Sequence, residues 1–260
     1  MRTIRKLYQF FVDKPIKTGE LLNNHYEVLK VIGTGSYGIV YLCEELETRE
    51  KVVVKQLRPS KSSNRKEVKM FESEISVLRK LSHDKIPTFY GSFLHKKQLF
   101  YVMSFIDSDN LEDQIFFSNL TFNEKESLLI LYQLLDLVDY LHKKHIYHQD
   151  LRIPNILLKN RELFLIDFGL SIHNDEGKET VEMRQQDYYD LGDILLYLLY
   201  TTYSSKNKKA LPWTEELSLE NETVYLLKRL LQIDEPYSNT SEIFTDLHAA
   251  LSKQTGVTGT

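Results

Sequence analysis

The 260-residue sequence contains only one cysteine, Cys43, so no disulfide can form within the chain. A chain without disulfides is typical of a reducing compartment, and we expect a cytoplasmic protein. Long apolar runs are also missing. The longest, residues 194–200, is far too short for the roughly 20 residues that a membrane-spanning helix needs. The first residues contain no uninterrupted apolar segment, which argues against a secretory signal peptide.

The chain has no excess of positive charge. Its formal net charge is −4, which gives no indication of a nucleic-acid partner. The charges are unevenly distributed, because residues 1–103 contain 19 Lys and Arg against 11 Asp and Glu, whereas the remainder contains 14 against 26. We therefore expect two regions with different surfaces, and an ordinary solvated face explains this more readily than a dedicated docking patch.

Residues 1–25 read as an N-terminal extension. Apolar residues at helical spacing predict a short amphipathic helix, formed by Ile4, Leu7, Tyr8 and Phe11. We expect this helix to pack on the body of the protein. Peripheral contact of residues 2–11 with a membrane surface is the less favoured alternative.

The order of elements predicts two unlike lobes. Alternating patterns predict strands over 26–33, 39–46, 52–57, 89–95 and 99–106, interrupted by a basic loop over 58–69 and a helix over 71–82. Beyond Asp109 the pattern becomes helical, with a long helix over 121–145 for which Thr121 is the expected N-cap. Further helices are expected over 190–202, 220–233 and 240–251, and short strands near 155–159 and 163–169. Strands followed by helices are typical of an α+β fold.

Three glycines, Gly33, Gly35 and Gly38, lie between two predicted strands. A GxGxxG sequence is weak evidence alone, since it also marks dinucleotide-binding units in which a helix follows the glycines. Here a strand follows, so we expect a β-hairpin whose backbone N–H groups can close over phosphates. An ordinary glycine-rich turn is the alternative.

Lys55 ends an apolar run that reads as a buried strand. A buried lysine needs an anionic partner, because an unpaired charge away from water is costly. Glu74 lies on the apolar face of the following helix, whereas Glu72 points nearly opposite, so Glu74 is the expected partner. The alternative is that Lys55 extends from the strand end into solvent.

Polar residues with oxygen ligands follow in the second half. Asp167 ends an apolar strand, and Asn155 precedes the strand expected to pair with it. Carboxylate and amide oxygens suit magnesium bound to a phosphate. Asp150 can accept a proton from a hydroxyl, and Arg152 can neutralise a transferred phosphoryl group. Each of these residues alone also has an ordinary loop role.

Taken together, these motifs resemble the protein kinase family. The resemblance covers about residues 26–251 and is carried by "GTGSYGIVY", "VVVK", "EISVLRKLSH", "HQDLRIPN", "LIDFG" and "DYYDLGDILL". The closest general type is the small cytosolic eukaryotic-like Ser/Thr kinases of bacteria. The resemblance implies a bilobal α+β fold, with a β-rich ATP-binding lobe over 26–104, a mostly helical catalytic lobe over 105–251 and a flexible tail over 252–260.

The resemblance also implies roles for individual residues. Asp150 would position the acceptor hydroxyl, Arg152 would stand for the lysine usual in Ser/Thr kinases, and Lys55 would hold the ATP phosphates and pair with Glu74. Asn155 and Asp167 would hold Mg²⁺ or Mn²⁺. The remaining ATP contacts implied by the family are Ile32, Gly33, Thr34, Gly35, Ser36, Tyr37, Gly38, Val40, Val53, Met103, Ser104 and Ile106. A protein substrate is expected, which includes the chain itself.

The chain departs from the family at two places in the second lobe, the residue before Asp150 and the segment that follows Asp167. Gln149 replaces the arginine that usually precedes the catalytic aspartate and binds a phosphorylated activation segment. Only 20 residues separate Asp167 from Asp187, and no Ala-Pro-Glu occurs between them. We expect residues 174–186 to form a polar, mobile segment that makes a weak floor for a peptide. Two alternatives stay open: an atypical or small-molecule kinase of the same fold, and a pseudokinase scaffold.

Overall fold

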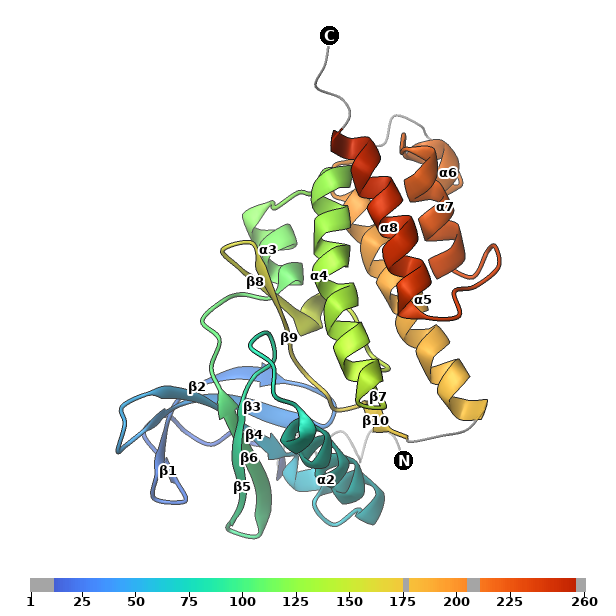
Figure 1. The fold of residues 1–260 in the computed structure, drawn as a ribbon. Helices are drawn as coiled ribbons and strands as arrows, with labels where there is room; N and C mark the ends of the chain where they lie inside the picture. The colour runs from blue at the N-terminus through green and yellow to red at the C-terminus, as the bar shows by residue number, and fades with distance from the viewer. Residues whose placement is uncertain (1–11, 175–177, 205–210, 256–260) are drawn as a thin grey trace. The chain divides into compact units, whose positions relative to one another are not determined.

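The computed structural model describes residues 12–174, 178–204 and 211–255, so the expected helix over residues 4–11 lies outside the described residues. Contacts divide the chain into two compact units (Figure 1). Unit 1 runs up to Asp107 and includes Phe168–Leu170, and unit 2 comprises Ser108–Asp167 and the chain from Ser171 onward. Unit 1 is built on a sheet and unit 2 mainly on helices, so the predicted α+β fold class is confirmed.

Unit 1 contains one antiparallel sheet of six strands in the order β1-β2-β3-β4-β6-β5. The strands are β1 (Leu21–Leu22), β2 (Tyr26–Thr34), β3 (Gly38–Glu45), β4 (Lys51–Leu57), β5 (Phe89–His95) and β6 (Gln98–Ser104). The sheet therefore begins at Leu21, within the segment that the sequence assigns to the extension. The predicted strands from residue 26 to residue 104 each have a counterpart.

The two faces of this sheet carry different residues, as the strand register shows. On one face an apolar core collects Leu22, Val28, Ile39, Tyr41, Cys43, Val52, Val54, Phe100 and Val102. Side chains alternate along a strand, so the neighbours of these residues point to the opposite face. There the register aligns Val40, Lys55 and Tyr101 in one row across three strands. The next row contains Leu42, Val53 and Met103.

Helix α2 (Arg65–Lys80) supplies the other main element of unit 1, after a short 3₁₀ turn η1 (Pro59–Lys61). The helix begins six residues before the predicted start at residue 71. The reason is an N-cap that the apolar pattern did not reveal: Asn64 Oδ1 accepts a 3.0 Å hydrogen bond from the backbone N–H of Lys66. The buried face comprises Phe71, Glu74, Ile75, Val77 and Leu78.

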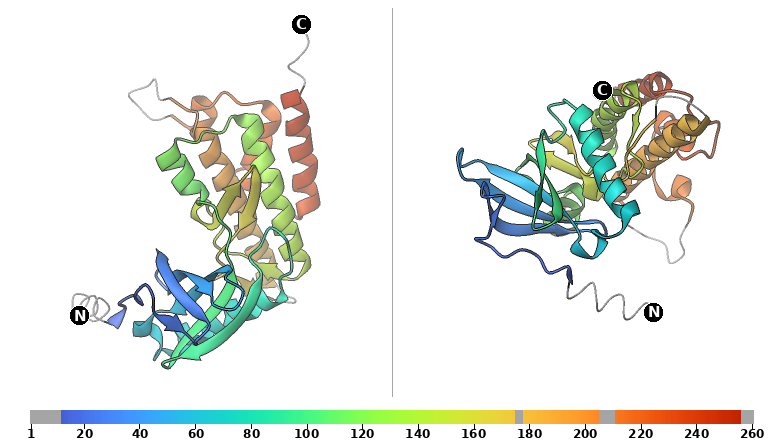
Figure 2. Two further views of the ribbon diagram at one scale, coloured as in Figure 1. Left: turned by 90° about the vertical axis from the view of Figure 1, so that its left-hand side faces the viewer. Right: turned by 90° about the horizontal axis from the view of Figure 1, so that it is seen from below.

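Unit 2 is built around α4 (Glu124–Lys143), which packs against α5 (Lys178–Tyr200) and α8 (Thr240–Thr255) (Figures 1 and 2). The other elements are α3 (Leu111–Ser118), β7 (Ile146–Tyr147), η2 (Ile153–Asn155), β8 (Ile156–Lys159), β9 (Glu162–Leu165), β10 (Ile172–His173), α6 (Trp213–Glu216) and α7 (Asn221–Leu230). Thr121 is not the N-cap of α4, contrary to prediction. Asn123 caps the helix in a reciprocal capping box with Glu126.

Helix α5 starts much earlier than predicted. We expected a helix from residue 190 and a mobile polar segment over 174–186, but residues 178–186 form the first turns of α5. The expectation was wrong because this stretch, although it has few apolar residues, contains good helix formers and no proline. Contacts to other parts of unit 2 also fix it, since Gln185 Nε2 donates to the carbonyl of Tyr237 and Arg184 Nη1 donates to that of Ser238.

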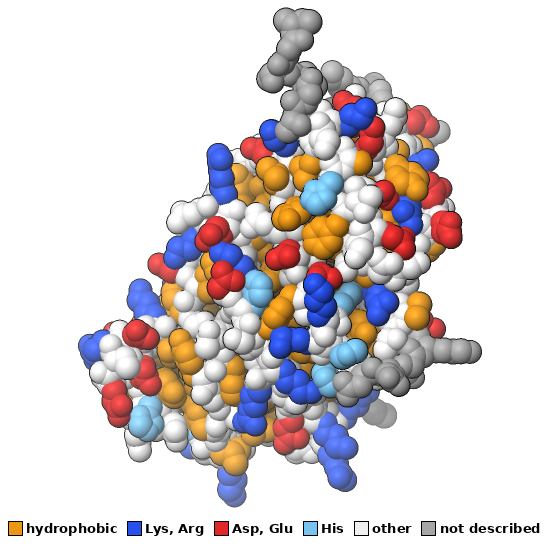
Figure 3. All heavy atoms as spheres, in the orientation of Figure 1, with side chains coloured by type: hydrophobic (Ala, Val, Ile, Leu, Met, Phe, Trp, Pro, Cys, Tyr) orange, Lys and Arg blue, Asp and Glu red, His pale blue; other side chains and the backbone are white. Residues whose placement is uncertain are grey.

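On the face shown in Figure 3, acidic and basic side chains are mixed over the part of unit 2 that contains α7 and α8. Apolar side chains are scattered between them. Within the described ranges, none of the helices combines the length and the apolar character needed to cross a membrane.

Candidate active site

The glycine-rich segment of unit 1 forms the expected β-hairpin. Residues 35–37 connect β2 to β3, and the backbone N–H of Gly35 donates to the carbonyl of Gly38 at 3.0 Å. A Cβ on Gly38 would lie 2.9 Å from the carbonyl oxygen of Gln56, which is a backbone atom that cannot easily move. A glycine is therefore required at position 38 for β3 to lie this close to β4.

Lys55 and Glu74 form a buried ion pair, with 2.7 Å between Lys55 Nζ and Glu74 Oε1. The side chains are 9% and 4% exposed. Tyr101, next to Lys55 across the sheet, donates its hydroxyl to the same Oε1 at 2.8 Å. A buried pair needs such additional hydrogen bonds to offset desolvation. The ammonium group is thereby fixed on the Val40 side of the sheet.

Three of the residues expected around adenine, Val40, Val53 and Met103, share that side of the sheet. Val40 and Val53 lie in adjacent rows there, and Met103 pairs with Val53. Ser104 already donates its backbone N–H to the carbonyl of Thr88 at 2.9 Å. The backbone N–H of Ser104 is therefore already used as a donor. Its carbonyl is the backbone group that could accept a hydrogen bond from an adenine amino group. Ile32 and Tyr37 are exposed.

In unit 2, α5 anchors the loop that contains Asp150. The buried carboxylate of Asp187 accepts hydrogen bonds from the backbone N–H groups of His148 at 3.0 Å and Gln149 at 2.8 Å. It also contacts His142 Nε2 at 2.8 Å. Gln149 has a left-handed backbone conformation, with φ of 64°, which is unfavourable for a residue with a side chain. The hydrogen bond to Asp187 offsets this cost.

Asp150, Arg152 and Asn155 converge, as their spacing predicts. Asp150 Oδ2 lies 3.2 Å from Asn155 Nδ2 and 3.3 Å from Arg152 Nε. Asn155 Nδ2 also donates to the Asp150 carbonyl at 2.9 Å, so Oδ1 is the atom of this amide that can ligate a metal. Arg152 is mostly exposed and can move to a ligand.

Asp167 follows β9 and has a φ of 63°, also in the left-handed region. The backbone N–H of Ile166 donates to the carbonyl of Asn155 at 2.9 Å, which fixes the chain before Asp167 beside Asn155. In the described parts of the chain, no group of three or more His, Cys, Asp or Glu side chains is arranged so that it could hold a metal ion. Two oxygen-donor side chains fit Mg²⁺, which usually takes one or two protein ligands and completes its shell with water and phosphate oxygens.

One residue beside the loop that contains Asp150 was not found from the sequence. Asp190 accepts hydrogen bonds from the backbone N–H of Leu151 at 3.2 Å and from Gln186 Nε2 at 2.7 Å. Burial raises the pKa of Asp190 to about 6; the two hydrogen bonds lower it, whereas the charges of Asp187 and Asp150 raise it. Its position one turn after Asp187 on α5 was the available signal.

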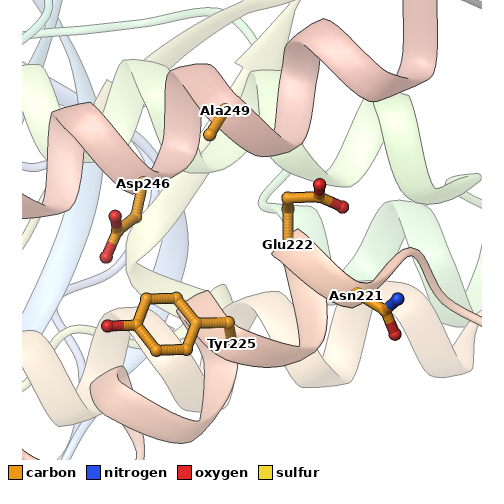
Figure 4. A pocket seen from close by; sticks show the side chains of 5 residues that line it. All are labelled: Asn221, Glu222, Tyr225, Asp246 and Ala249. Carbon is orange, nitrogen blue, oxygen red and sulfur yellow. The ribbon is translucent and has the colours of Figure 1, made fainter.

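Unit 2 also contains a hollow of about 200 Å³ between α7 and α8, lined by Asn221, Glu222, Tyr225, Asp246 and Ala249 (Figure 4). Its two carboxylates already have basic partners. Glu222 pairs with Lys253 at 3.3 Å, and Asp246 with Arg229 at 3.0 Å. Arg229 also pairs with Glu242 at 2.9 Å. The hollow therefore presents no unpaired charge to a ligand.

Comparison of the sequence with known proteins shows which family the chain belongs to. Residues 26–207 match the protein kinase domain. The chain is 41% identical to the probable serine/threonine-protein kinase YbdM of Bacillus subtilis, over 97% of this chain and 99% of that protein. It is 30% identical to an Aurora kinase of Schizosaccharomyces pombe, over 72% of this chain and 54% of that protein.

A third relative, the human myosin light chain kinase family member 4, is 32% identical over 58% of this chain and 39% of that protein. The chain thus spans nearly all of the bacterial relative but about half or less of the length of the two eukaryotic ones. The family match covers most of the chain and includes both the glycine hairpin of unit 1 and the loop of unit 2 that contains Asp150. The chain therefore belongs to the protein kinase family.

Proposed function

We propose that the protein transfers the γ-phosphate of ATP to serine or threonine hydroxyls of proteins, with Mg²⁺ or Mn²⁺ as the metal. The observation that carries this proposal is the arrangement around Asp150, whose carboxylate is held by Asn155 and Arg152 on a loop anchored to α5. Preorganisation of this kind is what phosphoryl transfer needs from a protein.

The residues of unit 1 are assigned to ATP. Backbone groups of the hairpin over 33–38 cover the phosphates, and Lys55, fixed by Glu74, binds the α- and β-phosphates. The adenine contacts are assigned to Ile32, Val40, Val53, Met103, Ser104 and Ile106. The buried Lys55–Glu74 pair supports this assignment, because it fixes a cation on the side of the sheet where Val40 and Val53 also lie.

The residues of unit 2 are assigned to the metal and the acceptor. Asn155 Oδ1 and the Asp167 carboxylate hold the metal ion, which neutralises charge on the phosphate oxygens when bound. Asp150 orients the acceptor hydroxyl and receives its proton as the oxygen–phosphorus bond forms and ADP leaves. Arg152 releases Asp150 and binds the transferred phosphoryl group through its planar fork.

A second candidate, an atypical kinase that does not bind extended peptides, is favoured by one observation. Helix α5 begins at Lys178, so three residues separate it from Asn174, whose backbone N–H donates to the carbonyl of His145 at 3.0 Å. That connection is too short for a peptide-binding platform. The complete set of Lys55, Asp150, Asn155 and Asp167 argues against a pseudokinase scaffold.

The test is incubation with γ-labelled ATP and Mg²⁺, with the protein alone and with a mixture of folded cell proteins. The proposal predicts label on phosphoserine or phosphothreonine after acid hydrolysis, and none when EDTA is present. Label found only on small molecules would favour the second candidate. The absence of any metal-dependent transfer, with ATP binding intact, would indicate a scaffold. A cytoplasmic location is part of the proposal and is tested by cell fractionation.

A further inference from the structure

Asp13, in the N-terminal extension, is a buried acid whose partners lie far along the chain. Its side chain is only 4% exposed. One oxygen, Oδ1, accepts the backbone N–H of Ser60 at 2.8 Å. The other, Oδ2, accepts the hydroxyl of Ser60 at 2.8 Å and Arg58 Nη1 at 3.1 Å. The carboxylate is thus fully used to hold the segment that follows β4.

Arg58 connects this acid to the glycine hairpin. While Nη1 contacts Asp13, its Nε donates to the carbonyl of Gly35 at 2.7 Å. The backbone N–H of Arg58 donates to the carbonyl of Tyr37 at 3.1 Å. Lys61 adds a third contact, because its ammonium lies 4.1 Å from the centre of the Tyr37 ring. The planar guanidinium therefore bridges the extension and the hairpin that is assigned to the ATP phosphates.

A second set of contacts fixes where the extension lies. The backbone N–H of Ile16 donates to the hydroxyl of Tyr41 at 3.2 Å, and that hydroxyl donates to Gln56 Oε1 at 2.7 Å. Ile16 also packs against the apolar core of the sheet. Asp13 therefore lies three residues before Ile16, which is fixed against the sheet.

We propose that Asp13 and Arg58 are positioning residues for ATP, which hold the glycine hairpin in the conformation that binds the phosphates; this inference rests on the proposed function. A hairpin with glycines has much conformational freedom, so ordering it on ATP binding costs affinity. The contacts from Asp13 to Arg58 and from Arg58 to Gly35 order the hairpin before ATP binds, which lowers this cost. Since the Arg58 charge is neutralised by Asp13, Arg58 acts through the hairpin and does not itself hold a phosphate.

The test uses Asp13→Asn and Arg58→Met, with Asp84→Asn as a matched control. Asp84 belongs to the same unit, but its side chain is 78% exposed. Calorimetry measures the Kd of MgATP without an acceptor, kinetics separate KM for ATP from kcat, and thermal melting reports the fold. A charge-assisted hydrogen bond of this kind is worth roughly tenfold or more.

We expect Kd and KM for ATP to rise about tenfold in Asp13→Asn and Arg58→Met, with kcat at saturating ATP nearly unchanged. The double variant should match the single variants, because both break the same chain of contacts. Arg58→Lys, which keeps the charge but loses the fork, should also lose affinity; it is the variant to measure if Asp13→Asn does not fold.

An ATP affinity within twofold of the wild type in folded Asp13→Asn and Arg58→Met would overturn the inference. So would an equal loss of affinity in Asp84→Asn. The calorimetric measurement needs no turnover. A wild-type protein that binds MgATP but transfers no phosphate would therefore refute the proposed function while the positioning role of Asp13 is still tested.

Discussion

The side-chain amide of Gln149 donates a 2.7 Å hydrogen bond to the main-chain carbonyl of Met183 in α5. The same nitrogen lies 3.2 Å from Oδ1 of Asp187. In the family, the residue at this position is usually an arginine that binds a phosphorylated residue. Here a neutral side chain contacts a helix directly, so the loop that contains Asp150 is connected to α5 without any phosphate.

Activity should therefore not depend on phosphorylation of residues 170–186. Phosphatase-treated protein is expected to phosphorylate an acceptor at its full rate from the first measurement, because the Gln149–Met183 contact is already formed. The measurement is a progress curve with and without prior incubation with ATP. A lag that prior incubation removes, traced by mass spectrometry to Thr180, would contradict this prediction.

The Lys55–Glu74 pair predicts a strong double-mutant coupling. Lys55→Met removes the cation that pairs with the buried Glu74, and Glu74→Gln removes the carboxylate that pairs with the buried Lys55. Each single variant should lose about 3 kcal/mol of unfolding free energy. The double variant should lose less than the sum, by about 1–3 kcal/mol, in chemical denaturation. Strict additivity would show that the pair is not buried in solution.

Much of the candidate site was predictable because each of its signals is local. An apolar run ending in Lys55, the helical phase that separates Glu74 from Glu72, and the close spacing of Asp150 and Asn155 are visible within short windows. The predicted pairing of Lys55 with Glu74 is seen in the structure. The start of α5 was missed because its first turns contain few apolar residues and no capping signal was recognised.

Asp13 and Asp190 were missed for a different reason. Asp13 contacts Arg58 across 45 residues, and Asp190 contacts Leu151 across 39. The sequence around Asp13 contains no signal for its contact, and the only signal for Asp190 is its position one turn after Asp187, since a buried aspartate looks the same as an exposed one. Asp13 reaches its partners because the extension is fixed at Ile16 by the Tyr41 hydroxyl, and Asp190 reaches Leu151 because α5 packs beside the loop that contains Asp150.

Asp190 predicts a pH-dependent cost in stability. Its pKa is raised from 3.8 to about 6, mainly by burial, so the folded state binds more protons than the unfolded state between these values. Stability attributable to Asp190 is present at low pH and is lost as the pH rises from about 4 to 6. Because the side chain is only partly buried, we expect a cost of about 1–2 kcal/mol above pH 6.

Asp190→Asn removes this charge. The unfolding free energy of Asp190→Asn minus that of the wild type should therefore be about 1–2 kcal/mol higher at pH 7.5 than at pH 4. Urea denaturation at both pH values measures this difference. Asp193→Asn, an exposed residue on the same helix, is the control. A difference between Asp190→Asn and wild type that does not change with pH would contradict the assignment.

The form of the substrate follows from the early start of α5. With residues 178–186 in a helix, no extended segment is available there as a floor for a peptide. We expect poor activity on generic short peptides and better activity on folded proteins or on the enzyme itself, with Ser62, Ser63 and the tail after Ser252 as the expected acceptors. A peptide array and a folded-protein screen make the comparison. A peptide consensus with micromolar KM would contradict the expectation.

The most direct test of the account is the rate of phosphate transfer by Asp150→Asn. Labelled ATP, Mg²⁺ and a mixture of folded acceptor proteins are used, and Asp193→Asn is the matched control. Because Asp150 orients the hydroxyl and takes its proton, we predict a loss of about 100-fold or more in kcat, with the melting temperature and the Kd for ATP unchanged. Wild-type turnover by Asp150→Asn in a clean preparation would contradict the central claim.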